Sequence, residues 1–211
     1  MMEDAKMNCV IGMEDLLKMN CVIGLDLSLT STGIVVLDQN GDVVRAEAIQ
    51  PTLKGLDRLG EIWVSIADIY QLAVYGKQLE VRGWVLEGYA YGAANAVAAC
   101  AELGGVVKYR LNDTLNQSIT IVPPSTLKKY VTSKGNSQKD MMRLEVFKRW
   151  QFDHPSNDVV DAYGLARVGL ALAGYDDKLT VIQRQVLAQL RGEKPVKKSR
   201  KRTKKLEASN S

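Results

Sequence analysis

Acidic side chains interrupt or end two strongly apolar segments of this chain, and no other feature constrains its fold as much. Asp26 lies in the apolar run 22–27 (VIGLDL), and Glu87 closes the run 84–87 (WVLE). Both segments are typical of buried strands, where an ionised carboxylate is unfavourable unless something pairs with it. Two more acids, Asp158 and Asp161, are three residues apart later in the chain. A divalent cation is the partner that suits all of these carboxylates.

Length and composition predict one folded domain. The chain has 211 residues, of which 46% are hydrophobic, enough for a real core. No apolar run reaches the roughly 20 residues of a membrane span, and the acidic, polar start is unlike a signal peptide. The 3 cysteines form no CxxC pair, which argues against a zinc site and fits a reducing compartment. We therefore expect a cytoplasmic protein with no membrane partner.

The single histidine, His154, excludes the usual serine and cysteine triads, because no nucleophile motif accompanies it. We interpret it as a polar loop residue before Pro155, although a place at the rim of a metal site stays open.

A short repeat and a basic tail flank the expected domain. The hexapeptide MNCVIG occurs at residues 7–12 and again at 19–24, and only the second copy continues into Leu25-Asp26. We therefore predict that residues 1–18 are an extension or duplicated segment outside the core, that 19–190 form the domain, and that 191–211 are a disordered tail. The stretch 194–205 contains eight basic residues and no acid, so the net charge of +4 comes from the tail.

Hydrophobic periodicity and turn signals predict three strands, then a helix, a strand, a helix, a strand and several helices. This order indicates an α/β fold, a mixed five-stranded sheet flanked by helices. The expected strands are 20–27, 33–37, 43–49, 81–87 and 118–122, and the expected helices are 56–75, 93–111, 125–131, 137–150, 157–172 and 180–190.

The four carboxylates suit phosphodiester hydrolysis. Two Mg²⁺ ions about 4 Å apart acidify the attacking water and stabilise the leaving oxygen, and Mg²⁺ prefers oxygen ligands. Asp158 and Asp161 share a helix face at spacing i, i+3, and Asp26 and Glu87 meet them if their strands are neighbours.

An actin-like or sugar-kinase phosphotransferase is a distant alternative, because such proteins open with a similar phosphate-cradling hairpin, here at residues 24–33. The sequence contains no second phosphate loop, which argues against this alternative.

A group of lysines follows the fifth expected strand. Lys128, Lys129, Lys134 and Lys139 lie within twelve residues, with no acid among them. Such a positive surface favours contact with backbone phosphates, and a solvated helix face is the alternative interpretation.

These motifs together resemble the RuvC family of Holliday-junction resolvases, over roughly residues 20–175. Residues 22–26 with Thr32-Gly33 resemble its first motif, and Leu86-Glu87 followed by Asn95 resembles the second. The segment 156–162 (SNDVVDA) resembles the third, Asp-x-x-Asp-Ala motif, and 124–139 resembles the segment that carries two DNA-binding lysines.

The resemblance implies a ribonuclease-H-like fold, which begins with three antiparallel strands, in a phage or bacterial member of the family. It implies Asp26, Glu87, Asp158 and Asp161 as ligands of two Mg²⁺ ions, with Mn²⁺ as a substitute. It also implies a homodimer on four-way or branched DNA, in a bacterial cell or a phage-infected host. Lys128 and Lys139 would lie at the scissile phosphate, and Lys129 and Lys134 are further candidates for DNA contact.

The chain departs from the family pattern in two places. The family's junction-wedging aromatic aligns with Ala90, so either neighbour, Tyr89 or Tyr91, is the candidate. The basic tail is longer than the family's cellular members lead us to expect, and its candidate DNA contacts are Lys197, Lys198, Arg200, Lys201 and Arg202. For dimer contacts the candidate is the Ala-rich helix 93–104, whose small residues equally suit packing on the sheet.

The sequence therefore predicts a Mg²⁺-dependent endonuclease that resolves Holliday junctions by paired symmetric nicks. A broader branched-DNA or RNA–DNA hybrid nuclease of the same fold, and a junction-binding protein without catalysis, stay open as alternatives.

Overall fold

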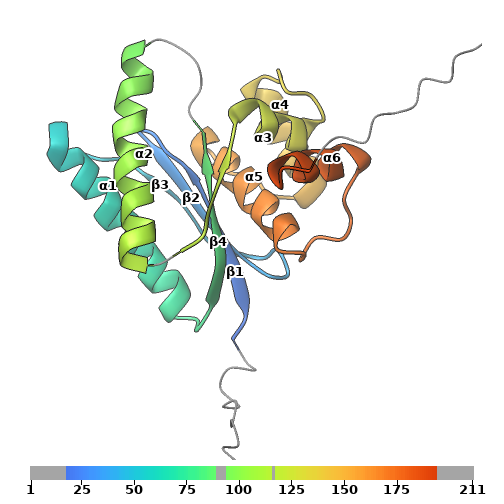
Figure 1. Cartoon of the computed structure of the whole chain (residues 1–211), viewed down its shortest axis with the longest axis horizontal. Helices are drawn as coiled ribbons and strands as arrows, with labels where there is room; N and C mark the ends of the chain where they lie inside the picture. Colours follow the sequence, from blue (N-terminus) through green and yellow to red (C-terminus); the bar gives the residue numbers. More distant parts are fainter. Residues whose placement is uncertain (1–17, 89–93, 116, 194–211) are drawn as a thin grey trace, which may run out of the picture.

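Five strands form one mixed sheet in the order β3-β2-β1-β4-β5 in the computed structural model (Figure 1). The structure describes residues 18–88, 94–115 and 117–193. β1, β2 and β3 are antiparallel neighbours, whereas β4 and β5 run parallel to β1. The α/β fold with a mixed five-stranded sheet is thereby confirmed, while the predicted extension and tail fall largely on residues outside the described ranges.

The elements follow the predicted order. They are β1 (Asn20–Asp26), β2 (Thr32–Asp38), β3 (Val43–Ile49), α1 (Gly55–Tyr70), a π-helical turn η1 (Gln71–Tyr75), β4 (Glu80–Glu87), α2 (Ala94–Leu115), β5 (Ile119–Val122), α3 (Pro124–Thr132), α4 (Lys139–Trp150), α5 (Asn157–Leu172) and α6 (Val181–Leu190).

Two helices differ from their predicted bounds. The helix expected over 56–75 ends as a π-helical turn, in which Ala73 and Val74 are buried. A single turn of this type shifts the phase of the helix, so that these two side chains reach the core. α2 continues one turn beyond its predicted end, because Leu115 packs partly against the same core as the buried Leu111.

The two faces of the sheet carry separate hydrophobic cores, with α1 and α2 on one face and α3 to α6 on the other (Figure 1). Because side chains alternate along a strand, Cys21, Ile23 and Leu25 of β1 face α1 and α2, whereas Val22 faces α5. Asp26 has the same parity as Val22. The alternation therefore assigns its carboxylate to the α5 face.

α5 is the central helix of its face, and most of its length is buried. A helix that is apolar on nearly all sides must be covered on all sides. β1, β2 and β4 lie beneath α5, and α3, α4 and α6 also contact it. An aromatic layer supports it as well, in which the rings of Phe152 and Tyr163 stack with centroids 4.1 Å apart. The guanidinium of Arg167 lies over Trp150 and pairs with Asp176 at 2.9 Å.

Two glycines let α5 approach the strands backbone to backbone. A Cβ atom added at Gly24 of β1 would collide with the carbonyl oxygen of Ala162 and come within 2.6 Å of the nitrogen of Ala166. A Cβ atom added at Gly33 of β2 would collide with the carbonyl oxygen of Asp158. No side chain fits at either point, so the distance between helix and sheet depends on both glycines.

Replacing Gly24 with alanine should lower the free energy of unfolding by about 1–3 kcal/mol or more, because backbone atoms of α5 have to move. Urea denaturation monitored by circular dichroism measures the change. The matched control is Gly60→Ala in α1, where an added Cβ atom has nothing within 4 Å. That variant should be neutral or stabilised by about 0.5–1 kcal/mol, since alanine suits a helix better than glycine. Equal stability of Gly24→Ala and the wild type would contradict the close contact.

Candidate active site

The register of β1 and β4 brings Asp26 and Glu87 together. The strands are parallel, and Leu25 pairs with Leu86, so each strand ends one residue later with its acid at the same edge of the sheet. Glu87 has the same parity as Val85, which belongs to the core under α5. Both carboxylates therefore lie on the α5 face, and a side-chain hydrogen bond joins them.

The contact at Gly33 adds the acids of α5. Gly33 is the β2 partner of Asp26, and the backbone of Asp158 lies directly on it. Asp158 is in the first turn of α5, and Asp161 follows one turn later on the same side. The structure thus brings together the four carboxylates that the sequence predicts as one site.

Burial and mutual repulsion raise the pKa values of three of these acids. Burial, followed by the charges of Glu87 and Asp161, raises the pKa of Asp26 well above its usual value. Burial and the charge of Asp161 raise the pKa of Glu87 to about 7. Burial also raises the pKa of Asp161 to about 6, with a contribution from Asp158. Perturbed carboxyl groups gathered in this way are typical of functional sites.

Two of the predicted lysines lie at these acids. The positive charges of Lys128 and Lys139 both act to lower the pKa of Glu87 and of Asp161. Lys128 is on α3, and Lys139 is the first residue of α4. The two lysines thus approach the acids from α3 and α4, elements that sequence reasoning could not place relative to β4.

Other predicted DNA-binding residues are not brought to the acids. Lys129 is in the last turn of α3, and Lys134 is exposed in the turn before α4. Their roles stay predictions. The remaining candidates, Tyr89, Tyr91, Lys197, Lys198, Arg200, Lys201 and Arg202, lie outside the described residues.

The loop between α4 and α5 contains structural contacts that the sequence did not reveal. His154 accepts a hydrogen bond from the backbone N–H of Ser156 at Nδ1 (3.1 Å), and its ring is parallel to that of Phe152. Arg143 of α4 donates two hydrogen bonds to Asp153, of 2.6 and 3.1 Å. These contacts link the helix that begins at Lys139 to the start of the acid-bearing helix. The opposite charges of Arg143 and Asp153 were the only sign of these contacts in the sequence.

The donor set fits a hard divalent cation. Carboxylate oxygens are the ligands that Mg²⁺ prefers, and the acids raise one another's pKa because their negative charge is incompletely balanced. Among the residues that the structure describes, no three Asp, Glu, His or Cys side chains converge closely enough to form a ready-made metal site. Asp26, Glu87, Asp158 and Asp161 therefore match the cation in chemistry, but their oxygens do not form a closed ligand shell in this arrangement.

Comparison with known proteins places the fold. No family model matches the chain, and no curated protein does. Among solved structures, RuvC of T. thermophilus in complex with a Holliday junction substrate superposes with a TM-score of 0.58 at 16% identity, over 74% of this chain and 93% of that one. A second Thermus thermophilus RuvC structure gives a TM-score of 0.53 at 16% identity, over 74% and 94% of the two chains.

The chain therefore has the fold of RuvC, a ribonuclease-H-like mixed sheet flanked by helices, as the sequence predicts. At 16% identity the likeness establishes the fold, whereas the chemistry has to be argued from the site itself. In the described part of the chain, no helix has the length and apolar character needed to cross a membrane.

The metal-free protein should lose stability as pH rises from 5 to 8, by a few kcal/mol at most. Folding raises the pKa of Glu87 from 4.5 to about 7, and each unit corresponds to about 1.4 kcal/mol. A group whose pKa rises on folding stabilises the protein fully at a pH below its pKa in the unfolded chain. This stabilisation is lost as the pH rises through its pKa in the folded protein. Urea denaturation in a chelating buffer at several pH values measures the slope.

Glu87→Gln should flatten this pH dependence, because glutamine carries no charge to repel Asp26 and Asp161. Glu102→Gln, at an exposed position of α2, is the matched control and should keep the wild-type slope. Identical slopes for Glu87→Gln and the wild type would show that Glu87 ionises without strain in the folded protein.

Proposed function

We propose that this chain is a metal-dependent, structure-selective DNA endonuclease that resolves Holliday junctions by paired symmetric nicks. The observation that carries the proposal is the gathering of partly buried carboxylates from β1, β4 and α5 beside the two lysines, at one edge of a sheet with the RuvC fold. A purely structural role would not account for acids that repel one another in a partly buried site.

In the proposed reaction, Asp26, Glu87, Asp158 and Asp161 would hold two Mg²⁺ ions, and Mn²⁺ would substitute for them. When bound, such ions supply an acidified water and a stabilised leaving oxygen for in-line hydrolysis. The four side chains would hold the ions on the α5 face of the sheet edge. The products would be a 5′-phosphate and a 3′-hydroxyl.

The lysines would act on the DNA phosphates. Lys128 and Lys139 already lie close enough to Glu87 and Asp161 to change their pKa values. A scissile phosphate held at the acids would therefore be within the field of both cations, which offset its charge in the transition state. Lys129 and Lys134 would extend the positive surface along the backbone of the same arm.

The substrate would be four-way DNA, and the active form a homodimer. One of the superposed RuvC structures is a complex with a Holliday junction substrate. A four-way junction has two-fold symmetry, and two cuts in strands of like polarity require two active sites related by a two-fold axis. α2 is our candidate for the dimer contact. Glu102 and Gly105 are exposed on it, although the side chains of its first turn lie outside the described set.

A wider activity on branched DNA is the second candidate. The run of eight basic residues within 194–205 favours it, because clustered cations bind DNA backbone without regard to sequence or shape. An RNA–DNA hybrid nuclease of the same fold and a non-catalytic junction-binding protein are the remaining alternatives, and the following experiments separate them.

Wild-type protein should nick a mobile four-way junction in Mg²⁺ at positions related by two-fold symmetry, and Asp26→Asn should reduce the cleavage rate by at least about a hundredfold. The substitution removes one anionic ligand, and metal ligation is worth several kcal/mol in the transition state. Cleavage-site mapping on labelled strands measures both effects, with flap, fork and RNA–DNA hybrid substrates in parallel.

Asp113→Asn, at an exposed position of α2, is the matched control and should cut like the wild type. If Asp26→Asn cuts as well as wild type, the assignment of Asp26 fails. Scattered cuts on flaps and forks would favour the debranching nuclease, and tight junction binding without cleavage in Mg²⁺ or Mn²⁺ would favour the binding protein.

Lys139→Met should lower junction cleavage by about tenfold or more and reduce the slope of log affinity against log salt by about 1, as expected when one phosphate contact is lost. Lys148→Met, near the other end of α4, is the matched control, because that lysine is exposed and pairs with Glu145. Affinity titrations at several salt concentrations provide the slope. Equal slopes for Lys139→Met and Lys148→Met would remove Lys139 from the DNA-contacting set.

A further inference from the structure

The sequence of the central strand is present twice in this chain. Residues 6–12 (KMNCVIG) repeat residues 18–24 without any difference. The second copy leads into β1, which starts at Asn20 and continues past Gly24 to the first acid. Since seven consecutive residues are identical, the first copy contains the same side chains that β1 uses as far as Gly24.

β1 makes strict demands on these residues, because it lies in the middle of the sheet. Cys21 and Ile23 are 0% exposed on the face of α1 and α2, and Val22 is 1% exposed on the face of α5. A Cβ atom added at Gly24 would collide with the carbonyl oxygen of Ala162. A segment that replaced β1 would therefore need side chains of the same size in the same order. The residues of the first copy that meet these demands are Cys9, Val10, Ile11 and Gly12.

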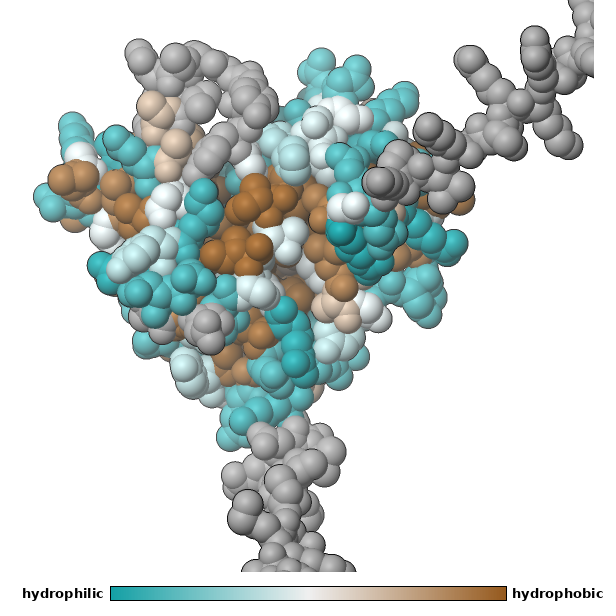
Figure 2. All heavy atoms as spheres, viewed as in Figure 1, coloured by the Kyte–Doolittle hydropathy of each residue, from teal (hydrophilic) through white to brown (hydrophobic). Residues whose placement is uncertain are grey.

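The chain enters β1 through polar contacts that either copy can make. The side-chain amide of Asn20 donates to Gln39 at 3.0 Å, and the backbone N–H of Glu80 donates to the carbonyl oxygen of Met19 at 2.9 Å. On the face shown in Figure 2, hydrophilic residues gather at this lower end of the sheet. Asn8 supplies the same amide in the first copy, and the second contact needs only a backbone carbonyl.

After the repeat, the first copy continues with residues of the kind that β1 requires. Met13 comes at the position of Leu25, which is 0% exposed. Exchange of leucine for methionine in a core usually changes a folding equilibrium by less than about tenfold. Glu14 comes next, at the position of Asp26, so a carboxylate still ends the strand. The first copy thus contains a complete alternative to β1, including its acid.

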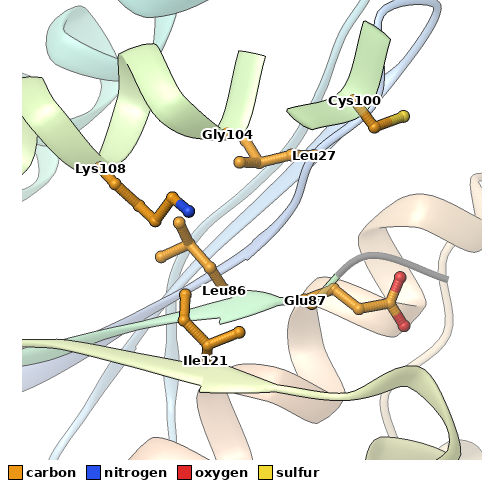
Figure 3. A pocket seen from close by; sticks show the side chains of 8 residues that line it. Leu27, Leu86, Glu87, Cys100, Gly104, Lys108 and Ile121 are labelled. Atoms are coloured by element: carbon orange, nitrogen blue, oxygen red, sulfur yellow. The ribbon is translucent and has the colours of Figure 1, made fainter. Parts of the chain in front are cut away.

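The residue after the acid favours the second copy. Leu27 lines a pocket between α2 and the sheet, together with Leu86 and Ile121 (Figure 3). In the first copy Asp15 would take the place of Leu27, and an acid beside these apolar side chains is unfavourable. The arrangement with Leu27 in the pocket is therefore the more stable one, and it is the one that the structure shows.

The connection to β2 permits both copies. Residues 27–31 join β1 to β2, and residues 15–31 would join them if the first copy formed the strand. Lengthening this loop from 5 to 17 residues lowers the population of the longer form by about sixfold, because the entropy of loop closure grows only with the logarithm of length. The longer loop is therefore a modest disadvantage.

We propose that residues 6–14 are a second version of β1, able to take the place of residues 18–26 between β2 and β4. In this second register Glu14 stands beside Glu87 in place of Asp26, with a side chain one methylene longer. The exchange would therefore alter the reach of one acid of the candidate site while the fold stays the same. It is a property of the sheet and holds whether or not the protein cuts DNA.

The register would be chosen as the chain folds. β1 is hydrogen-bonded to β2 and β4 and is covered by both hydrophobic cores. Exchange of the two copies in a folded molecule requires the centre of the sheet to open, and core strands open only with a free energy close to that of global unfolding. Molecules in the two registers therefore interconvert slowly and can be distinguished by chemical labelling.

Thiol labelling reports the register, because Cys9 and Cys21 exchange places. Cys21 is 0% exposed, and burial raises the pKa of its thiol to about 12, so its reaction with N-ethylmaleimide is slow. Mass spectrometry of the digested protein measures the labelling of each cysteine. The wild type should protect Cys21. Gly24→Val, which collides with α5 in the register of the structure, should protect Cys9 instead, with labelling of Cys9 at least about tenfold slower than in the wild type.

The glycine of the first copy provides the matched control. Gly12→Val blocks only the second register, so Cys21 should stay protected as in the wild type. Gly12→Val combined with Gly24→Val blocks both registers and should protect neither cysteine. Gly24→Val should still be less stable than the wild type, because the second register carries Asp15 at the place of Leu27. Continued protection of Cys21 in Gly24→Val would overturn the proposal.

A second variant decides the matter if Gly24→Val does not fold, as judged by circular dichroism. Asp15→Leu supplies the apolar residue that the pocket at Leu27 requires, so Gly24→Val with Asp15→Leu should fold with Cys9 protected. Glu3→Leu removes another acid of the same segment, outside the repeat, and should not restore folding. Failure of Asp15→Leu to restore the fold would also overturn the proposal. These measurements need neither DNA nor metal, so their outcome is independent of the proposed nuclease function.

Discussion

The contact of α5 with β1 and β2 is the constraint on which the rest of the molecule depends. Gly24 and Gly33 leave no Cβ atom in the way, so the helix backbone lies directly on the strands. Because Gly33 pairs with Asp26, the same contact that seats the helix also sets Asp158 beside the first strand. The position of α5 therefore determines both the packing against the sheet and the geometry of the candidate site, and a shift of the helix would change both.

The hydrophobic cores hold the acids together against their own repulsion. Raised pKa values at Asp26, Glu87 and Asp161 mean that ionisation of the site opposes folding by an amount of order a few kcal/mol. Each fully buried aliphatic side chain of α5 contributes roughly 1.5–3 kcal/mol in the other direction. Those side chains are Val159, Val160, Leu165, Val168 and Leu170. Together they outweigh the repulsion, and Lys128 and Lys139 relieve part of it.

Much of the fold could be predicted because periodicity and turn residues are local signals. Continuous apolar runs indicated that Asp26 and Glu87 belong to buried strands, and the spacing of Asp158 and Asp161 indicated one helix face. The π-helical turn at 71–75 and the last turn of α2 escaped prediction, because contacts with the core decide both.

From the sequence alone came the residue types, the order of the elements and the resemblance that made the four acids one hypothesis. Each of these depends on residues that are close together in the sequence. Only the tertiary structure decided that β4 lies parallel to β1 with its acid in register, and that α3 and α4 bring Lys128 and Lys139 to the same edge. Strand order and helix docking depend on which distant surfaces exclude water together, and no local pattern encodes that choice.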